Sequence, residues 1–230
     1  MMSVDKPKLR VLADQTQDPE TMNVWDNYFT WFDDASVWKN MQYHGIRTLK
    51  LPSDMWNYQE IIFDRKVTHV IETGTRHGGS ALFFADTLAA RTSDGFVVTV
   101  DIDAASNMVR EHERIRFLVG DSGSLEIAAE ISRLLPEKRG ALFLILDSDH
   151  SGNHVLRELE SLVPLLRFGD YLVVEDSCVN GHPVRPDFGP GPWEAVDHYI
   201  KRFPGTLKHD FARERKFGAT SCPNGYYEKL

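Results

Sequence analysis

A short apolar run that ends in ionisable residues is the first feature of this sequence that suggests chemistry. Residues 141–146 read ALFLIL, and Asp147, Ser148, Asp149 and His150 follow at once. A carboxylate at the end of a buried strand can hold a cation, and an imidazole three residues later can act as a general base near neutral pH. Asp147 could instead cap the next helix, because Asp is a favoured N-cap residue. The choice between a site and a cap depends on the elements around it.

Four further stretches show the same pattern of an apolar run that ends in an acidic residue. They read VTHVIETG (67–74), GFVVTVDID (95–103), IRFLVGDS (115–122) and DYLVVEDS (170–177). Helical spacing of apolar residues is found at 78–91, 124–135, 154–169 and 192–203. Strands that are apolar almost throughout and alternate with helices predict a mostly parallel sheet covered on both faces. We therefore predict a doubly wound, Rossmann-like α/β domain.

The C-terminal residues predict an antiparallel addition to this sheet. Two β-like stretches, LKHDFARERK (207–216) and ATSCPNGYYEKL (219–230), follow the last helix and indicate a hairpin at the sheet edge.

The N-terminal residues differ from the rest of the chain. Four of the five tryptophans lie in residues 21–60, which favours short helices that cover a pocket, although a plain helical extension is an alternative. Residues 1–20 are polar and are predicted to be loosely ordered. We expect a tail and helical lid at 1–62 and the Rossmann-like domain at 63–230.

Composition excludes several classes of protein. The net charge of −8 and the absence of a Lys/Arg block argue against general nucleic-acid binding. Two cysteines, Cys178 and Cys222, form neither a disulfide framework nor a structural zinc site. No apolar run approaches 18 residues, and residues 1–15 lack the apolar core of a signal peptide. We expect a cytoplasmic protein that acts on a small molecule.

The acidic residues at the strand ends are predicted to meet at one edge of the sheet. Ligands of open parallel sheets bind beyond the carboxyl ends of the strands. Those ends carry Glu72, Asp101, Asp121, Asp147 and the pair Glu175 and Asp176. Five successive acidic ends exceed what helix capping needs, because several are followed by a serine that could cap instead. We therefore expect these acids to bind ligands as a set.

The loop IETGTRHGGS (71–80) is predicted to hold a cofactor. It resembles a glycine-rich nucleotide loop but is not G-x-G-x-x-G, and a purely structural turn is the alternative. Asp101, 27 residues after Gly74, could accept hydrogen bonds from both hydroxyls of a ribose. A ribose-bearing cofactor without a pyrophosphate fits best, and S-adenosylmethionine is the obvious one. Asp121 would recognise the adenine amino group, or cap the helix at 124–135, or both.

The last two strand ends are predicted to hold a metal ion. Asp147, Glu175 and Asp176 supply hard oxygen ligands and no thiolate, which suits Mg²⁺ or Ca²⁺. Without a cation they would repel one another, unless one or two pair with Arg or Lys. His150 would then lie near a metal-bound substrate hydroxyl and take its proton.

A long Gly/Pro-rich stretch, SCVNGHPVRPDFGPGPW (177–193), follows Asp176. Loops of this length without secondary structure are uncommon unless they bind something. His182 and Arg185 could contact the substrate from this loop, whereas a nucleophilic role for Cys178 is not expected.

Taken together, these residues resemble the cephalosporin hydroxylase / rhamnosyl O-methyltransferase family, over nearly the whole chain beyond residue 36. The matching segments are WKNMQYHGIRTLKLPSDMWNYQEIIF (38–63), IETGTRHGGSALFFA (71–85), VTVDID (98–103), VGDS (119–122), LILDSDH (144–150), VVEDSCVNGHPV (173–184), GPGPWEAV (189–196) and NGYYEKL (224–230).

The resemblance implies a class I methyltransferase fold whose sheet has seven strands, the last of them antiparallel. It implies a divalent metal on Asp147, Glu175 and Asp176, with His150 as the base of an Asp-x-x-His arrangement shared by related macrolide sugar methyltransferases. The cofactor positions that it implies, together with their loop neighbours, are Glu72, Thr73, Gly74, Thr75, Gly78, Ser80, Asp101, Asp121 and Ser122. Lys50, Pro52 and Tyr58 match the family's N-terminal segment over the cofactor, but no role follows for them.

The expected function is an S-adenosylmethionine- and metal-dependent O-methyltransferase of secondary metabolism, acting on a hydroxyl of a natural product, expected to be a (deoxy)sugar. One alternative is a hydroxylation-linked or accessory protein of antibiotic biosynthesis, although the two-His-one-carboxylate pattern of non-haem iron oxygenases is missing. Another is a module that binds the cofactor without turnover, against which the intact set of acids and His150 argues. The aromatic N-terminal segment could also form the interface of a homo-oligomer.

Overall fold

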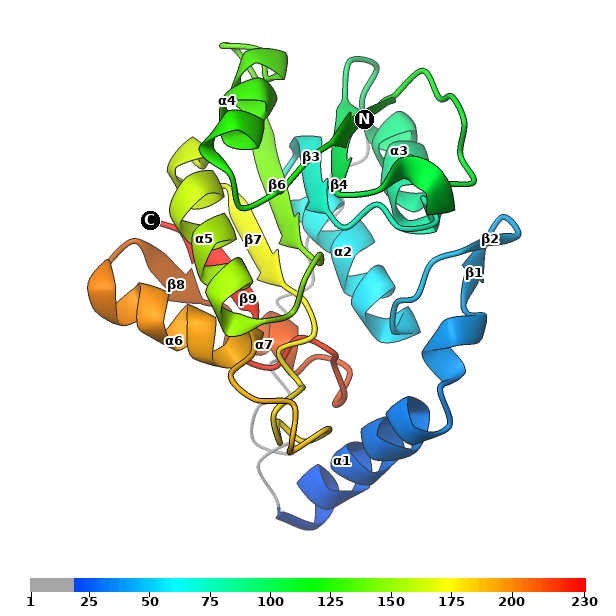
Figure 1. Ribbon diagram of the computed structural model, residues 1–230, viewed down its shortest axis with the longest axis vertical. Coiled ribbons are helices and arrows are strands. Elements are labelled where there is room, and N and C mark those ends of the chain that lie inside the picture. Colours follow the sequence, from blue (N-terminus) through cyan, green and yellow to red (C-terminus); the bar gives the residue numbers. More distant parts are fainter. Residues whose placement is uncertain (1–18) are drawn as a thin grey trace, which may run out of the picture.

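The computed structural model describes the backbone of residues 19–230 and side chains from residue 23 onward, built around one seven-stranded sheet (Figure 1). The strands are β3 (Val67–Thr73), β4 (Phe96–Asp101), β5 (Ile115–Val119), β6 (Ala141–Leu146), β7 (Tyr171–Val174), β8 (Leu207–His209) and β9 (Tyr226–Lys229). Their spatial order is β5-β4-β3-β6-β7-β9-β8. β3 to β7 run parallel, and β9 is antiparallel to both of its neighbours. The predicted class I methyltransferase fold is confirmed.

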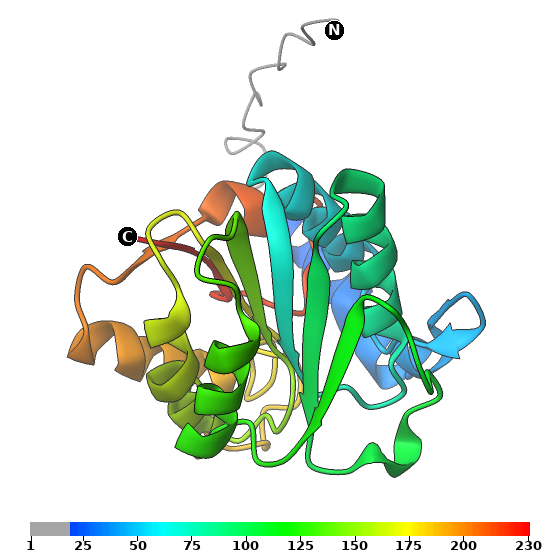
Figure 2. The same ribbon diagram turned by 90° about the horizontal axis from the view of Figure 1, so that it is seen from above.

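Helices cover both faces of the sheet, as Figure 2 shows. They are α1 (Pro19–Asp34), α2 (Pro52–Asp64), α3 (Gly79–Arg91), α4 (Leu125–Leu134), α5 (Gly152–Leu162), α6 (Pro192–Arg202) and the short α7 (Phe211–Glu214), with 3-10 turns η2 (Val37–Asn40), η3 (Ala104–Ser106) and η4 (Val163–Leu165). Alternation along β6 divides the core: Leu142, Leu144 and Leu146 pack with α4, α5 and α6. Phe143 and Ile145 pack with α2 and α3 on the other face.

The strand order reverses between β3 and β6, and this reversal places the site. The chain adds β4 and β5 on one side of β3, then returns to build β6 and β7 on the other. Thr73 pairs with Leu146, so the first residues beyond these two strands, Gly74 and Asp147, are neighbours. A Cβ on Gly74 would lie 1.7 Å from the carbonyl oxygen of Asp147, which explains the glycine there.

The C-terminal stretches differ in part from their prediction. β8 and β9 form the predicted antiparallel pair at the sheet edge, but residues 211–214 are helical. β9 lies between β7 and β8, and Tyr226 and Tyr227 are buried in the cores on opposite faces of the sheet.

Helix α2 lies mostly within the segment 1–62 that is expected to form the tail and lid, and it packs against the sheet. Tyr58, Ile61 and Ile62 of α2 belong to the core against the sheet. The lid proper is α1, η2 and the small hairpin of β1 (Gln42–Tyr43) and β2 (Ile46–Arg47). Figure 1 shows α1 beside the loop between β7 and α6, where Phe29 and Phe32 are buried.

Two expectations about the N-terminus and membranes remain. The predicted loose order of residues 1–20 falls almost wholly outside the described residues. Within residues 19–230, no helix combines the length and apolar character that crossing a bilayer requires.

Candidate active site

A cavity of about 700 Å³ lies at the carboxyl ends of the strands. Its walls come from the loop after β3, from residues following β4 to β7, and from the lid. Of the residues predicted from the sequence, Gly74, Thr75, Ser80, Asp101, Asp121, Ser122, Asp147, His150, Asp176 and Arg185 line it. Most of the predicted site residues therefore line one cavity, as expected if the carboxyl ends of the parallel strands meet at one edge of the sheet.

The loop after β3 forms the part of the wall predicted to hold the cofactor. Gly74 has a φ of 86° and donates its N–H to the carbonyl of Val100 at 2.7 Å, which ties the loop to β4. Asp101 accepts hydrogen bonds from the backbone N–H of Arg76 (2.7 Å) and of Asp103 (3.1 Å). The carboxylate at the end of β4 is thus fixed at the cavity wall before any ligand binds.

Three predicted cofactor residues, Glu72, Thr73 and Gly78, do not line the cavity. Glu72 is fully buried and accepts from Thr99 Oγ1 (2.8 Å), while its Oε1 has no hydrogen-bond partner among the described residues. Burial raises its pKa, an effect that Lys50 opposes. Thr73 Oγ1 accepts from the N–H of Asp147, and Gly78 begins α3 with a φ of 85°. These three residues therefore support the loop from the side that faces away from the cavity.

Asp121 is held by a partner that the sequence analysis did not identify. Arg157 of α5 donates to its Oδ2 at 2.8 Å, and this hydrogen bond lowers the pKa of Asp121. Asp121 does not cap α4, because the Oγ of Ser124 accepts the N–H of Ile127 in that role. Arg157 also lines the cavity, and no signal in the sequence distinguishes it from other helical arginines.

Ser122 belongs to a buried polar group beneath the same wall. Its Oγ and that of Ser148 donate to Glu158 Oε1 at 2.5 and 2.6 Å. Glu158 is fully buried, and its Oε2 has no hydrogen-bond partner within the part of the chain that the structure describes.

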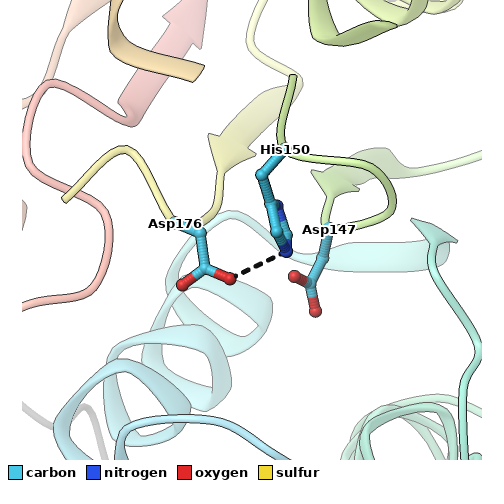
Figure 3. Close-up of side chains that lie close together, drawn as sticks. All are labelled: Asp147, His150 and Asp176. Carbon is cyan, nitrogen blue, oxygen red and sulfur yellow. Dashed lines mark ion pairs between the residues drawn. The ribbon is translucent and has the colours of Figure 1, made fainter. Parts of the chain in front are cut away.

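Asp147, His150 and Asp176 all line the cavity, and their side chains lie close together (Figure 3). One possible ligand atom from each lies within 4.8 Å of the other two, and His150 Nε2 is 3.0 Å from Asp176 Oδ2. Burial alone would lower the pKa of His150, but Asp176, followed by Asp147 and Glu175, raises it to about 9. Burial raises the pKa of Asp147 to about 6, although Lys50 opposes this. Two carboxylates and an imidazole facing one point can hold a cation or exchange a proton.

Glu175, predicted as a metal ligand, is not part of this cluster. Its side chain is 4 % exposed and does not line the cavity. Its Oε1 accepts from Lys50 Nζ (2.7 Å) and from the hydroxyl of Tyr58 (2.8 Å). Lys50 also contacts Asp147 Oδ2 at 2.5 Å. The alternative that some of these acids pair with a lysine is therefore realised for two of the three.

The two residues expected to contact substrate lie in different settings. Arg185 lines the cavity, pairs with Asp33 of α1 through Nε (3.0 Å) and Nη2 (2.6 Å), and lies 5.8 Å from the ring centre of Trp38. His182 does not reach the cavity. It stacks on Trp193 and lies 3.0 Å from Glu194 Oε1, which holds it against α6.

The strand order divides the cavity into two halves. We call the walls from the loops after β3, β4 and β5, with Arg157, the strand-end half. We call the walls from α1, Trp38, Leu51 and residues 178–185 the lid half. Asp147, His150 and Asp176 follow β6 and β7, which lie next to β3 in the sheet, and α1 packs on the residues that come after Asp176. The three side chains therefore lie between the two halves. Such an arrangement can bring a group bound on one side to a group bound on the other.

Comparison with known proteins places the chain in a family. Residues 35–230 match the family model described as rhamnosyl O-methyltransferase/CmcI. Proteins named rhamnosyl O-methyltransferase from Mycobacterium tuberculosis and Mycobacterium leprae are 49 % and 46 % identical, over 88 % and 90 % of this chain and 84 % and 90 % of theirs.

Solved structures agree on the fold. The structure of CmcI with Mg and SAM superimposes with a TM-score of 0.66 at 22 % identity, covering 84 % of this chain and 77 % of that one. An O-methyltransferase from Bacillus cereus in complex with SAH gives 0.54 at 18 % identity, covering 81 % and 90 %. The chain therefore belongs to the rhamnosyl O-methyltransferase/CmcI family, and the predicted enzyme class, a methyltransferase, is confirmed.

Proposed function

We propose that this protein is an S-adenosylmethionine- and divalent-metal-dependent O-methyltransferase that methylates a sugar hydroxyl of a natural product in secondary metabolism. The observation that carries this proposal is the convergence of Asp147, His150 and Asp176 between the two halves of one cavity. The names of the relatives, all rhamnosyl O-methyltransferases at 46 to 49 % identity, support a sugar acceptor.

The strand-end half fits the cofactor. Asp101, whose two oxygens are held by the backbone N–H groups of Arg76 and Asp103, would accept hydrogen bonds from the ribose hydroxyls. Asp121 and Ser122 would face the adenine, and Gly74 to Ser80 would hold the amino acid end. S-adenosylmethionine supplies an electrophilic methyl group on a sulfonium. The carboxylates around the cavity favour that positive charge.

The central cluster fits a divalent cation. Two carboxylates, with one imidazole nitrogen within 4.8 Å, form a donor set dominated by hard oxygens, which suits Mg²⁺ or Ca²⁺. Asp147 and Asp176 would hold the ion directly, and Glu175 would support them from behind through Lys50. A bound cation lowers the pKa of an acceptor hydroxyl that it contacts.

His150 would act as the general base. Its imidazole lies at the cavity wall, and Asp176, 3.0 Å from Nε2, raises its pKa. A cation held by Asp147 and Asp176 would oppose that rise and leave the imidazole able to take a proton from the acceptor. The cluster has one histidine and two carboxylates, which differs from the two-His-one-carboxylate set of iron oxygenases. Because the reaction needs an oxygen aligned with a methyl group, positioning by both halves contributes much of the rate.

The lid half fits the acceptor. Its wall is mainly apolar, with Phe29, Phe32 and Trp38 at the surface of the cavity. An aromatic wall suits the C–H face of a deoxysugar ring. The paired side chains of Asp33 and Arg185 would meet its hydroxyl groups.

Calorimetric titration with S-adenosylmethionine, with and without a metal chelator, tests this function. We expect one cofactor to bind per chain. In a separate assay of methyl transfer, removal of divalent ions should lower the rate at least about 100-fold. Cofactor affinity should change less than about threefold, because the strand-end half does not include the cation. Absence of binding at millimolar cofactor would contradict the proposal.

A further inference from the structure

Lys50 is a buried cation beside the candidate metal site, and the family resemblance gives it no role. Its side chain is 1 % exposed, and its Nζ lies 2.5 Å from Asp147 Oδ2 and 2.7 Å from Glu175 Oε1. Lysine is almost never fully buried unless it is paired, so its place here requires both carboxylates.

The backbone before Lys50 is arranged to send this side chain inward. Leu49 has a φ of 59°, which is rare for a bulky residue that is not glycine. Leu51 then begins α2 as its N-cap. Tyr58, further along α2, donates to the same Glu175 oxygen that Lys50 contacts. Strained backbone of this kind persists when the surrounding contacts determine it.

We propose that Lys50 is a positioning residue that sets the charge of the metal site, an inference that rests on the proposed metal dependence. Asp147, Glu175 and Asp176 together carry three negative charges when ionised. Lys50 offsets one of them, and the two charges that remain match the charge of a divalent cation.

Lys50 also fixes how two of the carboxylates are presented. It binds one oxygen of Asp147 and one of Glu175, and the hydroxyl of Tyr58 donates to that same Glu175 oxygen. The second oxygen of each carboxylate is left free of Lys50. A flexible carboxylate pair is thereby held in one orientation before a cation arrives.

Three variants separate this role from simple packing, with Mn²⁺ as the probe and binding measured by calorimetry or electron paramagnetic resonance. Lys50→Met raises the negative charge of the site, so it should bind Mn²⁺ at least about 10-fold more tightly. Glu175→Gln, which keeps the shape and removes a negative charge, should bind it at least about 10-fold more weakly. Tyr58→Phe removes a neutral partner of the same oxygen and should stay within about threefold of wild type.

A purely structural role for Lys50 cannot explain why the affinity for Mn²⁺ should rise in Lys50→Met and fall in Glu175→Gln. If Lys50 only packs the lid against the sheet, Lys50→Met should weaken Mn²⁺ binding or leave it unchanged, and either result overturns the proposal. A Lys50→Met protein that folds only when Mn²⁺ is present supports it. Should that variant not fold at all, Glu175→Gln decides: unchanged affinity overturns the proposal, and loss of affinity supports it. Lys39→Met, at the exposed Lys39, is the matched control.

Failure here and failure of the proposed function are distinguishable. The binding of Mn²⁺ does not depend on methyl transfer, and cofactor titration does not depend on Lys50. A wild-type protein that binds no Mn²⁺ overturns this inference and the metal dependence together, while cofactor binding still tests the methyltransferase function.

Discussion

The strand-end half and the lid half of the cavity are built from different kinds of structure. In the strand-end half, the carboxylates of Asp101 and Asp121 are fixed by hydrogen bonds to backbone N–H groups and to Arg157. In the lid half, α1 is held by apolar contacts of Phe29 and Phe32 and by the ion pair of Asp33 with Arg185. The first half follows from the sheet itself, whereas the second depends on contacts between segments distant in the sequence.

This difference suggests that the two halves bind different molecules. A site fixed by the sheet suits a cofactor that does not vary, and a site built from a helix and a loop can change with the acceptor without disturbing the fold. Substitutions in the strand-end half should therefore affect cofactor affinity, and substitutions in the lid half should affect the acceptor. The predictions below test this separation.

Asp101→Asn should give the larger of the two binding effects. The amide keeps the shape of the side chain but loses the negative charge that accepts from Arg76 N–H and that, on the proposed function, would accept from the ribose hydroxyls. We expect the dissociation constant of S-adenosylmethionine to rise about 10- to 100-fold, since a hydrogen bond to a charged group contributes about 1.5–3 kcal/mol. The KM for the acceptor should stay within about twofold.

Asp103→Asn is the matched control for this measurement, because Asp103 caps the exposed turn η3 and does not line the cavity. Equal losses in the two variants would show that Asp101 acts only through the local fold.

Arg185→Met should give a smaller effect, and this effect should fall on the acceptor and not on the cofactor. It removes the bidentate pair with Asp33 and the contact over Trp38, so we expect the KM for the acceptor to rise about 5- to 10-fold. Cofactor affinity should not change beyond about twofold. Because the guanidinium is exposed, the free energy of unfolding should change by less than about 1 kcal/mol. A loss of cofactor affinity instead would contradict the separation of the two halves.

The smallest effect is expected from the carboxylate that anchors the loop of the lid half. Glu194 accepts from His182, Gly191 N–H and Asn180. Burial raises its pKa, but these three hydrogen bonds outweigh burial and lower it to about 2. Its pKa is therefore lower in the folded protein than in the unfolded chain. Its stabilisation is fully present above about pH 4.5 and is lost as the pH falls towards 2.

Urea unfolding of wild type and Glu194→Gln between pH 6 and pH 3 measures this contribution. The two proteins should differ by about 1 kcal/mol or less at pH 6, because water screens a partly exposed carboxylate, and the difference should shrink as the pH falls. Glu126→Gln, on the exposed surface of α4, is the control. A difference that grows on acidification would refute the assigned hydrogen bonds.

The sequence predicts the strand-end half better than the lid half for a physical reason. Apolar runs that end in Gly74, Asp101 and Asp147 identify strand ends, and parallel strands bring their ends together whatever else the chain does. No local pattern reports that α1 would cover the cavity, or that His182 would stack on Trp193 instead of reaching it. Those outcomes depend on tertiary contacts.

The pair Glu175 and Asp176 shows the same limit at the scale of two residues. Both follow β7, yet Asp176 lies in the left-handed region at a φ of 52° and faces His150, while Glu175 turns towards Lys50, 125 residues away. Sequence spacing predicts that both reach the strand end. The spacing does not predict which of the two carboxylates will pair with a distant lysine.

Methyl transfer by His150→Ala tests the central claim most directly. The assay follows transfer from labelled S-adenosylmethionine to an alkyl rhamnoside that the wild type methylates, with cofactor affinity measured on the same preparation and His198→Ala, exposed on α6, as the control. If His150 is the base between the two halves, kcat should fall about 10²- to 10⁴-fold while cofactor affinity stays within about threefold. Turnover that is retained in His150→Ala, with the cofactor still bound, would contradict this account.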